Sequence, residues 1–212
     1  MFNLNDVRIL LTGFEAWAGN KNPSGMIAKE LDGKIISDAH VVGMVLPEDF
    51  YAIPRLARKL VAEVKPDAII STGWDYTRAI KVEKVALNIM NSYFADKVVP
   101  DNYGNKPCDE PVIKKGPLAL RSTFPADDIV KELKKRKIPA AISYHAGTHC
   151  CNTAMYSFLY QGVVSGFIHV PPLPEMIKDN DKTMPMPLQK QKRAIEIAIE
   201  VCAKHISSKK SA

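Results

Sequence analysis

Two adjacent cysteines, Cys150 and Cys151, stand where an apolar run and a small-residue turn give way to a helical pattern. Unpaired backbone N–H groups and the helix dipole favour an anion at the start of a helix. A thiol at that position is expected to lose its proton more readily, and the thiolate is the nucleophilic form of cysteine. The pattern predicts a nucleophile at one of the two cysteines, although their spacing does not separate them. The alternative is a buried cysteine that serves only packing.

His169 lies in a second short apolar run, 165–172, and is a candidate general base for such a thiol. A histidine base needs a partner on its other ring nitrogen, which fixes the tautomer. Several carboxylates are candidates for that partner: Glu15, Asp75, Glu83 and Asp101. The alternative for His169 is a hydrogen-bonded core residue, and the sequence does not show whether the thiol and the imidazole meet.

A metal site is the competing interpretation of the segment around the cysteines. It contains four residues of the types that bind zinc, namely His145, His149, Cys150 and Cys151. Gly147, however, disfavours a helix that would align the two histidines, and we find no second group of ligands along the chain. We therefore expect no metal centre.

Short apolar runs alternate with helical patterns along the chain. Strands are expected at 7–14, 41–46 and 68–73, and a helix opens at Asn22-Pro23-Ser24. The alternation predicts an α/β fold, a three-layer α/β/α sandwich with a mainly parallel twisted sheet, in a single domain spanning 1–212. Because ligands bind at the carboxyl ends of such strands, the site walls are expected after Thr12, Thr72, Tyr144 and Val170. The stretch 90–123 is expected to be a long loop.

Composition limits the possible partners. The chain has 212 residues, of which 46% are hydrophobic and 25% charged, as in an ordinary globular protein. The net charge of +6 comes from scattered lysines without interleaved aromatic residues, which favours a solvated surface over nucleic-acid binding. Apolar runs are too short to cross a membrane, and the N-terminus lacks the pattern of a secretion signal. We expect a cytoplasmic protein with its four cysteines as free thiols.

Two aromatic residues, Phe14 and Trp17, follow the first glycine turn. They would form either a packing cluster or a flat apolar wall for a small planar ring. No Gly-x-Ser-x-Gly elbow, phosphate-binding loop or dinucleotide fingerprint is present in the sequence.

Five separated motifs occur in order along the chain: Thr12–Trp17 with Asn22–Ser24, Val82–Asn88, Pro100–Asn105, Ser143–Asn152 and Gly166–Pro171. Together they resemble the pyroglutamyl peptidase I family, also called the pyrrolidone-carboxylate peptidases. In that family an asparagine follows the nucleophile, so the resemblance implies that Cys151 is the nucleophile, His169 the base and Glu83 its orienting partner. It also implies a cysteine exopeptidase that removes N-terminal pyroglutamate from peptides, uses no cofactor and assembles as a homotetramer.

The chain departs from the family pattern around the expected substrate pocket. The loop 74–78 is bulkier than usual, and Lys97 lies where an oxyanion-stabilising arginine is common. His149 and Cys150 replace residues that are usually apolar or aromatic. We therefore include these residues among the expected substrate contacts: Phe14, Trp17, Trp74, His149 and Cys150. The alternatives are a related cysteine amidohydrolase with altered specificity and a non-catalytic binding homologue.

Overall fold

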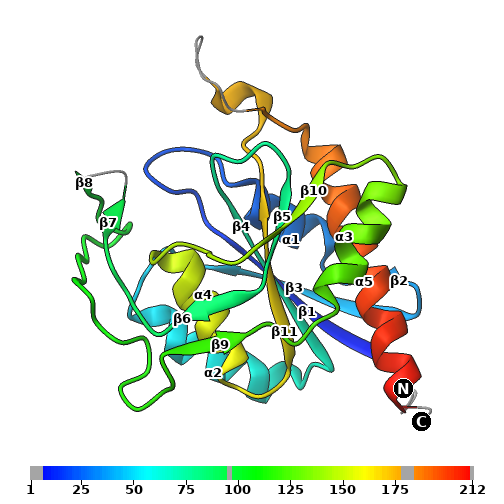
Figure 1. Ribbon diagram of the computed structural model, residues 1–212, viewed down its shortest axis with the longest axis horizontal. Helices are drawn as coiled ribbons and strands as arrows, with labels where there is room; N and C mark the ends of the chain where they lie inside the picture. Colours follow the sequence, from blue (N-terminus) through cyan, green and yellow to red (C-terminus); the bar gives the residue numbers. More distant parts are fainter. Residues whose placement is uncertain (1–6, 95–96, 178–183, 211–212) are drawn as a thin grey trace.

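A seven-stranded sheet forms the centre of the computed structural model, which describes residues 7–94, 97–177 and 184–210 (Figure 1). The strand order is β10-β5-β11-β4-β1-β3-β2. Their bounds are β1 Val7–Phe14, β2 Ile35–Ile36, β3 Ala39–Leu46, β4 Ala68–Trp74, β5 Ile80–Glu83, β10 Ala140–Ser143 and β11 Val164–Val170. The central pairs β3–β1, β1–β4 and β4–β11 are parallel, as is β5–β10, whereas β5–β11 and β2–β3 are antiparallel. The sheet is therefore mixed but mostly parallel.

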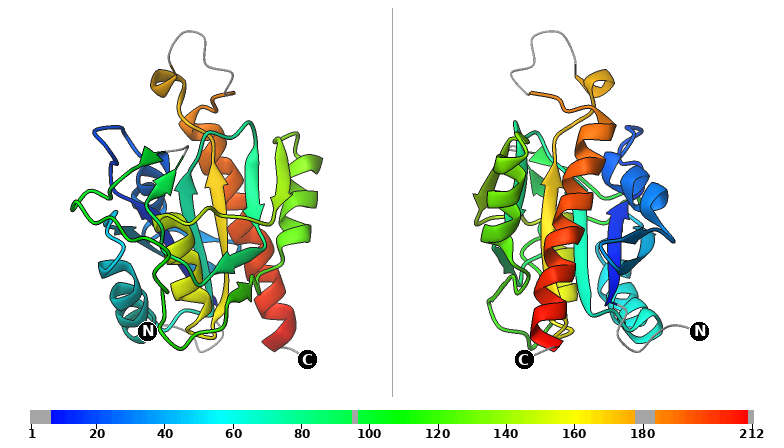
Figure 2. Two further views of the ribbon diagram at one scale, coloured as in Figure 1. Left: turned by 60° about the vertical axis from the view of Figure 1, so that its left-hand side comes forward. Right: turned by 90° about the vertical axis from the view of Figure 1, so that its right-hand side faces the viewer.

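Helices cover both faces of this sheet (Figure 2). Their bounds are α1 Pro23–Leu31, α2 Ala52–Val64, α3 Ala126–Lys135, α4 Cys150–Leu159 and α5 Leu188–Lys210, with a short 3-10 turn at Pro174–Met176. Side chains of α1, α3 and α5 pack into one core with one face of the sheet, and side chains of α2 and α4 pack into a second core with the other. The predicted α/β class and layered architecture are confirmed.

Local sequence signals explain where the helices near the site begin. The Asn22 side chain accepts a hydrogen bond from the backbone N–H of Ser24 at 3.1 Å, and Pro23 occupies the first turn of α1, as the sequence predicted. Before α2, the Asp49 carboxylate accepts hydrogen bonds from the N–H groups of Tyr51 and Ala52. Asp49 therefore satisfies backbone donors at the start of α2, although the helix itself begins at Ala52.

The region expected to be one long loop contains short strands. Within 90–123, β7 (Tyr93–Phe94) pairs with β8 (Lys97–Val98), and β9 (Ala119–Arg121) pairs with β6 (Val85–Leu87), which lies just before this region. These strands have only two or three residues, too few to show the alternation by which a strand is recognised in a sequence.

The parallel strands bring distant segments to one edge of the sheet. Phe14 at the end of β1 pairs with Leu46 at the end of β3, and Val170 at the end of β11 pairs with Trp74 at the end of β4. The loops that follow these strands therefore start side by side, where α/β proteins bind their ligands.

Candidate active site

A cavity of about 230 Å³ opens at this edge. Its walls come from the loops after β1, β3 and β4, from the end of β11 and from the segment that leads into α4, and they include Trp17, Glu48, Trp74, His149, Cys151 and His169. The loop 145–149 lines the cavity even though β10, which precedes it, runs antiparallel to β11. Segments that follow Thr12, Thr72 and Tyr144 therefore line the cavity as expected, whereas no described residue after Val170 does.

Cys151 lies in the first turn of α4 with its side chain against β4. A Cβ atom added to Gly73 would lie 2.7 Å from the Cys151 Sγ and 2.9 Å from the Phe167 ring, so only glycine leaves the sulfur its place. Gly73 is also the register partner of His169 in the β4–β11 pair. The thiol and the imidazole therefore lie over adjacent strands and face the same cavity.

His169 and Glu83 form a buried pair. The His169 Nδ1 lies 2.9 Å from the Glu83 Oε1, and the two residues are 5% and 0% exposed. Glu83 is opposite Phe167 in the β5–β11 register, so His169, two residues further along β11, lies on the same face and within reach. Because a carboxylate oxygen accepts, Nδ1 donates, and Nε2 is the nitrogen that can exchange a proton with the thiol.

The structure also separates Glu83 from the other candidate carboxylates. Asp75 forms an ion pair with Lys81 at 3.0 Å. Asp101 accepts hydrogen bonds from the backbone of Phe50, Tyr103 and Asn105, and thereby holds the turn that follows Pro100. Glu15 accepts hydrogen bonds from the Glu48 N–H and the Asn102 amide. Glu83 is the carboxylate that contacts His169.

The environment of Cys151 opposes the expectation that the helix start alone ionises the thiol. Burial raises the pKa of Cys151 well above its usual value, and the negative charges of Glu48, Asp75 and Glu83 raise it further, whereas a backbone N–H lowers it. The free energy needed to remove a thiolate from water exceeds the stabilisation that the helix N-terminus gives it. The helix start alone therefore does not favour the thiolate, and a neighbouring base is needed to form the nucleophile.

Cys150 lies behind the cavity wall. It is fully buried and does not line the pocket, which corrects the expectation that it contacts substrate. Burial raises the pKa of the Cys150 thiol well above its usual value, and the nearby Glu48 carboxylate, to which the thiol donates a hydrogen bond, raises it further. Burial likewise raises the pKa of Glu48 to about 8.

Phe14 is a second correction. Its ring is 1% exposed and packs in the core beneath α2 and α4, so it does not form a wall of the cavity. Its position as the last residue of β1 turns it to the interior face of the sheet. The expected aromatic wall is formed instead by Trp17, Trp74 and His149, with ring centroids of Trp17 6.4 Å from Trp74 and 5.5 Å from His149.

Lys97 does not replace the family's arginine at the cavity. It is exposed on β8 and is not among the lining residues. The backbone N–H groups at the start of α4 lie nearer the thiol and are suited to stabilising an oxyanion.

Three residues whose roles were missed become visible only in the fold. Glu48 reaches the cavity from the end of β3, Gly73 makes room for the sulfur, and Asn152 ties α4 to the chain after Glu83. The Asn152 side chain accepts from the Leu87 N–H and donates to the Leu87 and Ile89 carbonyls, each within 2.9 Å. The position of Glu48 just after a predicted strand was the available signal, since strand ends line such sites.

A thiol and an imidazole that face one cavity, with a buried carboxylate behind the imidazole, are the groups of a cysteine hydrolase. Comparison with known proteins narrows this class. The sequence model of the pyroglutamyl peptidase family matches residues 7–205, and the chain belongs to this family of cysteine peptidases. The family and enzyme class predicted from the sequence are thereby confirmed, in preference to the two alternatives.

Individual relatives agree. The chain is 41% identical to the pyrrolidone-carboxylate peptidase of Pyrococcus furiosus over 210 residues, covering 92% of this chain and 99% of the relative. It is 40% identical to the pyrrolidone-carboxylate peptidase of Chromobacterium violaceum, covering 91% of each. The solved pyrrolidone carboxyl peptidase from Thermococcus litoralis superposes with a TM-score of 0.89 at 35% identity and 96% coverage of both chains.

Proposed function

We propose that Cys151, His169 and Glu83 form the triad with which this chain hydrolyses the amide bond after an N-terminal pyroglutamyl residue. The observation that carries the assignment is the buried His169–Glu83 hydrogen bond in the cavity that also holds the Cys151 sulfur. Each residue has one role: Cys151 is the nucleophile, His169 moves the proton, and Glu83 holds the imidazole tautomer.

Acylation begins when the His169 Nε2 accepts the thiol proton as the Cys151 sulfur attacks the carbonyl carbon between the pyroglutamyl ring and the next residue. The tetrahedral intermediate collapses when the C–N bond breaks, and His169 returns the proton to the departing amine. The products of this half-reaction are a shortened peptide with a free amine and a pyroglutamyl thioester on Cys151.

Deacylation uses the same groups. His169 accepts a proton from water, whose oxygen attacks the thioester carbonyl, and the proton then passes to the departing sulfur. Free pyroglutamate is released and the thiol is restored. Because the pKa of Cys151 is raised, the negative charge of Glu83 also matters for the rate, since it stabilises the imidazolium that forms in each half-reaction.

The cavity suits a small uncharged ring. Trp17, Trp74 and His149 offer flat apolar faces, and the pyroglutamyl lactam carries no ammonium group whose burial would cost free energy. An ordinary N-terminal residue brings such a charge into the pocket. This difference supports selection of pyroglutamyl over other N-termini.

Location, assembly and domain organisation extend the proposal. The mechanism needs a free thiol, and all four cysteines are free. Cysteines stay as thiols in a reducing compartment such as the cytoplasm, which is the location that we propose. None of the helices among the described residues has the length and apolar character that crossing a membrane requires. We further propose a single domain over 1–212 and a homotetramer, both on the family resemblance.

Hydrolysis of a pyroglutamyl coumarin amide, compared with the matching prolyl amide, tests the specificity. The two substrates differ by one carbonyl oxygen on the ring and by the positive charge of the prolyl amine, and we expect release from the pyroglutamyl amide only. Comparable kcat/KM values for both would refute pyroglutamyl specificity while leaving the hydrolase chemistry in place. The substitution Cys151→Ala should abolish release, whereas Cys108→Ser, at an exposed thiol outside the cavity, should not change it.

A further inference from the structure

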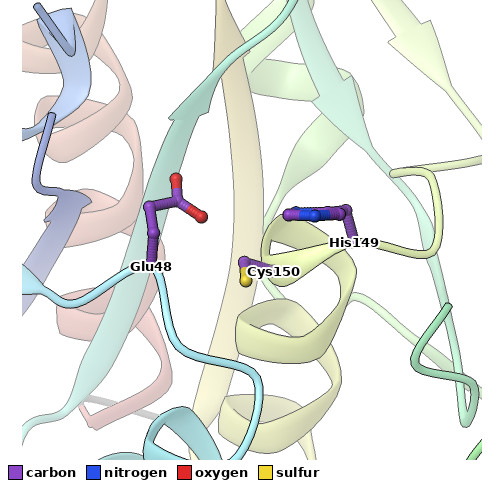
Figure 3. A group of neighbouring side chains, drawn as sticks. All are labelled: Glu48, His149 and Cys150. Carbon is purple, nitrogen blue, oxygen red and sulfur yellow. The ribbon is translucent and has the colours of Figure 1, made fainter. Parts of the chain in front are cut away.

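Glu48, His149 and Cys150 bring three metal-binding atoms together at the inner wall of the cavity (Figure 3). A carboxylate oxygen, a ring nitrogen and a thiol sulfur all lie within 4.8 Å of one another. Glu48 comes from the loop after β3, whereas His149 and Cys150 open α4, and in Figure 3 the carboxylate and the ring converge above the sulfur.

The His149 ring is held in place by its surroundings. Its centroid lies 4.5 Å from that of Phe50 and 5.5 Å from that of Trp17. The His149 Nε2 lies 3.2 Å from the Val99 carbonyl oxygen. Since a carbonyl oxygen only accepts hydrogen bonds, Nε2 donates and Nδ1 carries the lone pair. A hydrogen bond of this kind, made by the ring nitrogen that does not bind the metal, orients metal-bound histidines in proteins.

The other two ligands are buried and face each other. Glu48 is 5% exposed and Cys150 is fully buried, and the Cys150 thiol donates a hydrogen bond to the Glu48 carboxylate. The backbone that carries Glu48 is fixed on both sides, because its N–H donates to Glu15 and its carbonyl accepts from the Asn102 N–H. Among the described residues no lysine or arginine forms an ion pair with Glu48.

We propose that Glu48, His149 and Cys150 form a site for a divalent transition-metal ion with the chemistry of Zn²⁺, next to the nucleophile but separate from it. A thiolate, an imidazole and a carboxylate are ligands that zinc accepts, and the thiolate disfavours Mg²⁺ and Ca²⁺. The thiolate and the carboxylate together also balance the double charge of the ion.

The spacing fits tetrahedral coordination after small side-chain rotations. Zinc bonds of about 2.0 to 2.3 Å place neighbouring ligand atoms roughly 3.4 to 3.8 Å apart. Three protein ligands leave one position open, and because Glu48 and His149 both line the cavity, that position faces it. The expectation of no metal centre considered only residues close in the sequence, and the fold adds Glu48 from about a hundred positions away.

A bound ion would occupy space beside Cys151, so it would compete with substrate. This competition rests on the proposed function, whereas binding of the ion does not. The metal would then be a reversible inhibitor of the peptidase, not a participant in its reaction. The rival arrangement is an ion bound by Cys151 and His169, which also face the cavity.

Zinc affinity, measured by competition with a chromogenic chelator, distinguishes the two arrangements. We expect Cys151→Ala and the surface control Cys108→Ser to bind Zn²⁺ like the wild type. Losing an outer-shell partner of a metal weakens affinity by roughly 10- to 100-fold, so loss of a ligand in Cys150→Ala or His149→Gln should weaken it by more than about 100-fold. Tight binding that is lost in Cys151→Ala and kept in Cys150→Ala would overturn the proposal, as would equal affinity in every variant.

Cobalt provides a readout that does not depend on activity. Co²⁺ bound to a thiolate shows a sulfur-to-metal charge-transfer band, which should appear in wild type and in Cys151→Ala and be absent in Cys150→Ala. Circular dichroism establishes that each variant is folded, and His149→Gln tests the site independently should Cys150→Ala unfold. If Zn²⁺ binds as expected but no pyroglutamyl amide is hydrolysed, the site stands and the proposed function fails.

Discussion

Replacing Gly73 with alanine tests where the nucleophile lies. The added Cβ would lie 2.7 Å from the Cys151 Sγ, about 0.7 Å short of the 3.4 Å at which ordinary van der Waals contact begins. It would also lie 2.9 Å from the Phe167 ring, which limits movement of β4 in that direction. The sulfur must therefore move from the position that it holds over the β4–β11 pair.

The expected cost falls mainly on the chemical step. A misplacement of about 1 Å lowers catalysis by roughly 100-fold, so a shift of about 0.7 Å should lower kcat by roughly 10- to 100-fold. That loss corresponds to about 1.4 to 2.7 kcal/mol of activation free energy. Overpacking should also lower the free energy of unfolding by about 1 to 3 kcal/mol.

Steady-state hydrolysis of a pyroglutamyl coumarin amide and thermal unfolding, measured on the same preparations, separate the two effects. Ile70→Val is the matched control, because Ile70 is fully buried in the same strand and packs in the core on the opposite face. It should cost about 0.5 to 1.5 kcal/mol of stability and leave kcat unchanged. Wild-type kcat in Gly73→Ala would refute the placement of the sulfur.

Two further predictions concern the charged groups around the triad. Glu83→Gln keeps a hydrogen-bond acceptor for His169 but loses the charge, whereas Glu83→Ala loses both. We expect kcat/KM to fall from wild type to Glu83→Gln to Glu83→Ala, with a loss of roughly 10³- to 10⁴-fold in the alanine variant. Equal activity of the wild type and both variants would contradict the role of Glu83. The second prediction is the effect of Asp75 on the free energy of unfolding. Burial alone would raise the pKa of Asp75, but nearby His169, Lys81 and the Tyr76 N–H together lower that pKa. A lowered carboxyl pKa contributes stability that is present above about pH 4 and is lost as the pH falls through the folded-state pKa. Urea unfolding should therefore show Asp75→Asn less stable than wild type at pH 6 and closer to it at pH 3, and a gap that does not shrink would contradict the ion pair.

Local signals in the sequence predicted the parts of the fold that depend on local physics. The cap at Asn22, the buried central strands and the helix that opens at the cysteines all follow from side-chain pattern and backbone hydrogen bonding. β7 and β8 were missed because pairing with a neighbour, not their own composition, makes two residues extended.

For the site, the sequence likewise indicated which residues take part but not how they are arranged. Cys151, His169 and Glu83 were singled out together through the family resemblance, while their proximity depends on the register of β4, β5 and β11. Phe14 and Cys150 were misassigned because adjacency in the sequence does not say which face a side chain occupies. The raised pKa of Cys151 likewise depends on burial and on carboxylates that the fold brings close.

Alkylation by iodoacetamide, followed by mass spectrometry and activity on the same samples, tests the central claim that Cys151 is the nucleophile. Peptide mapping must distinguish Cys150 from the adjacent Cys151. Cys150 is buried, whereas Cys151 is partly exposed. We predict that loss of activity tracks carbamidomethylation of Cys151 in a one-to-one ratio, that pyroglutamate slows both, and that Cys108→Ser behaves like wild type. Full activity in protein modified at Cys151, or inactivation that tracks Cys150, would contradict the account.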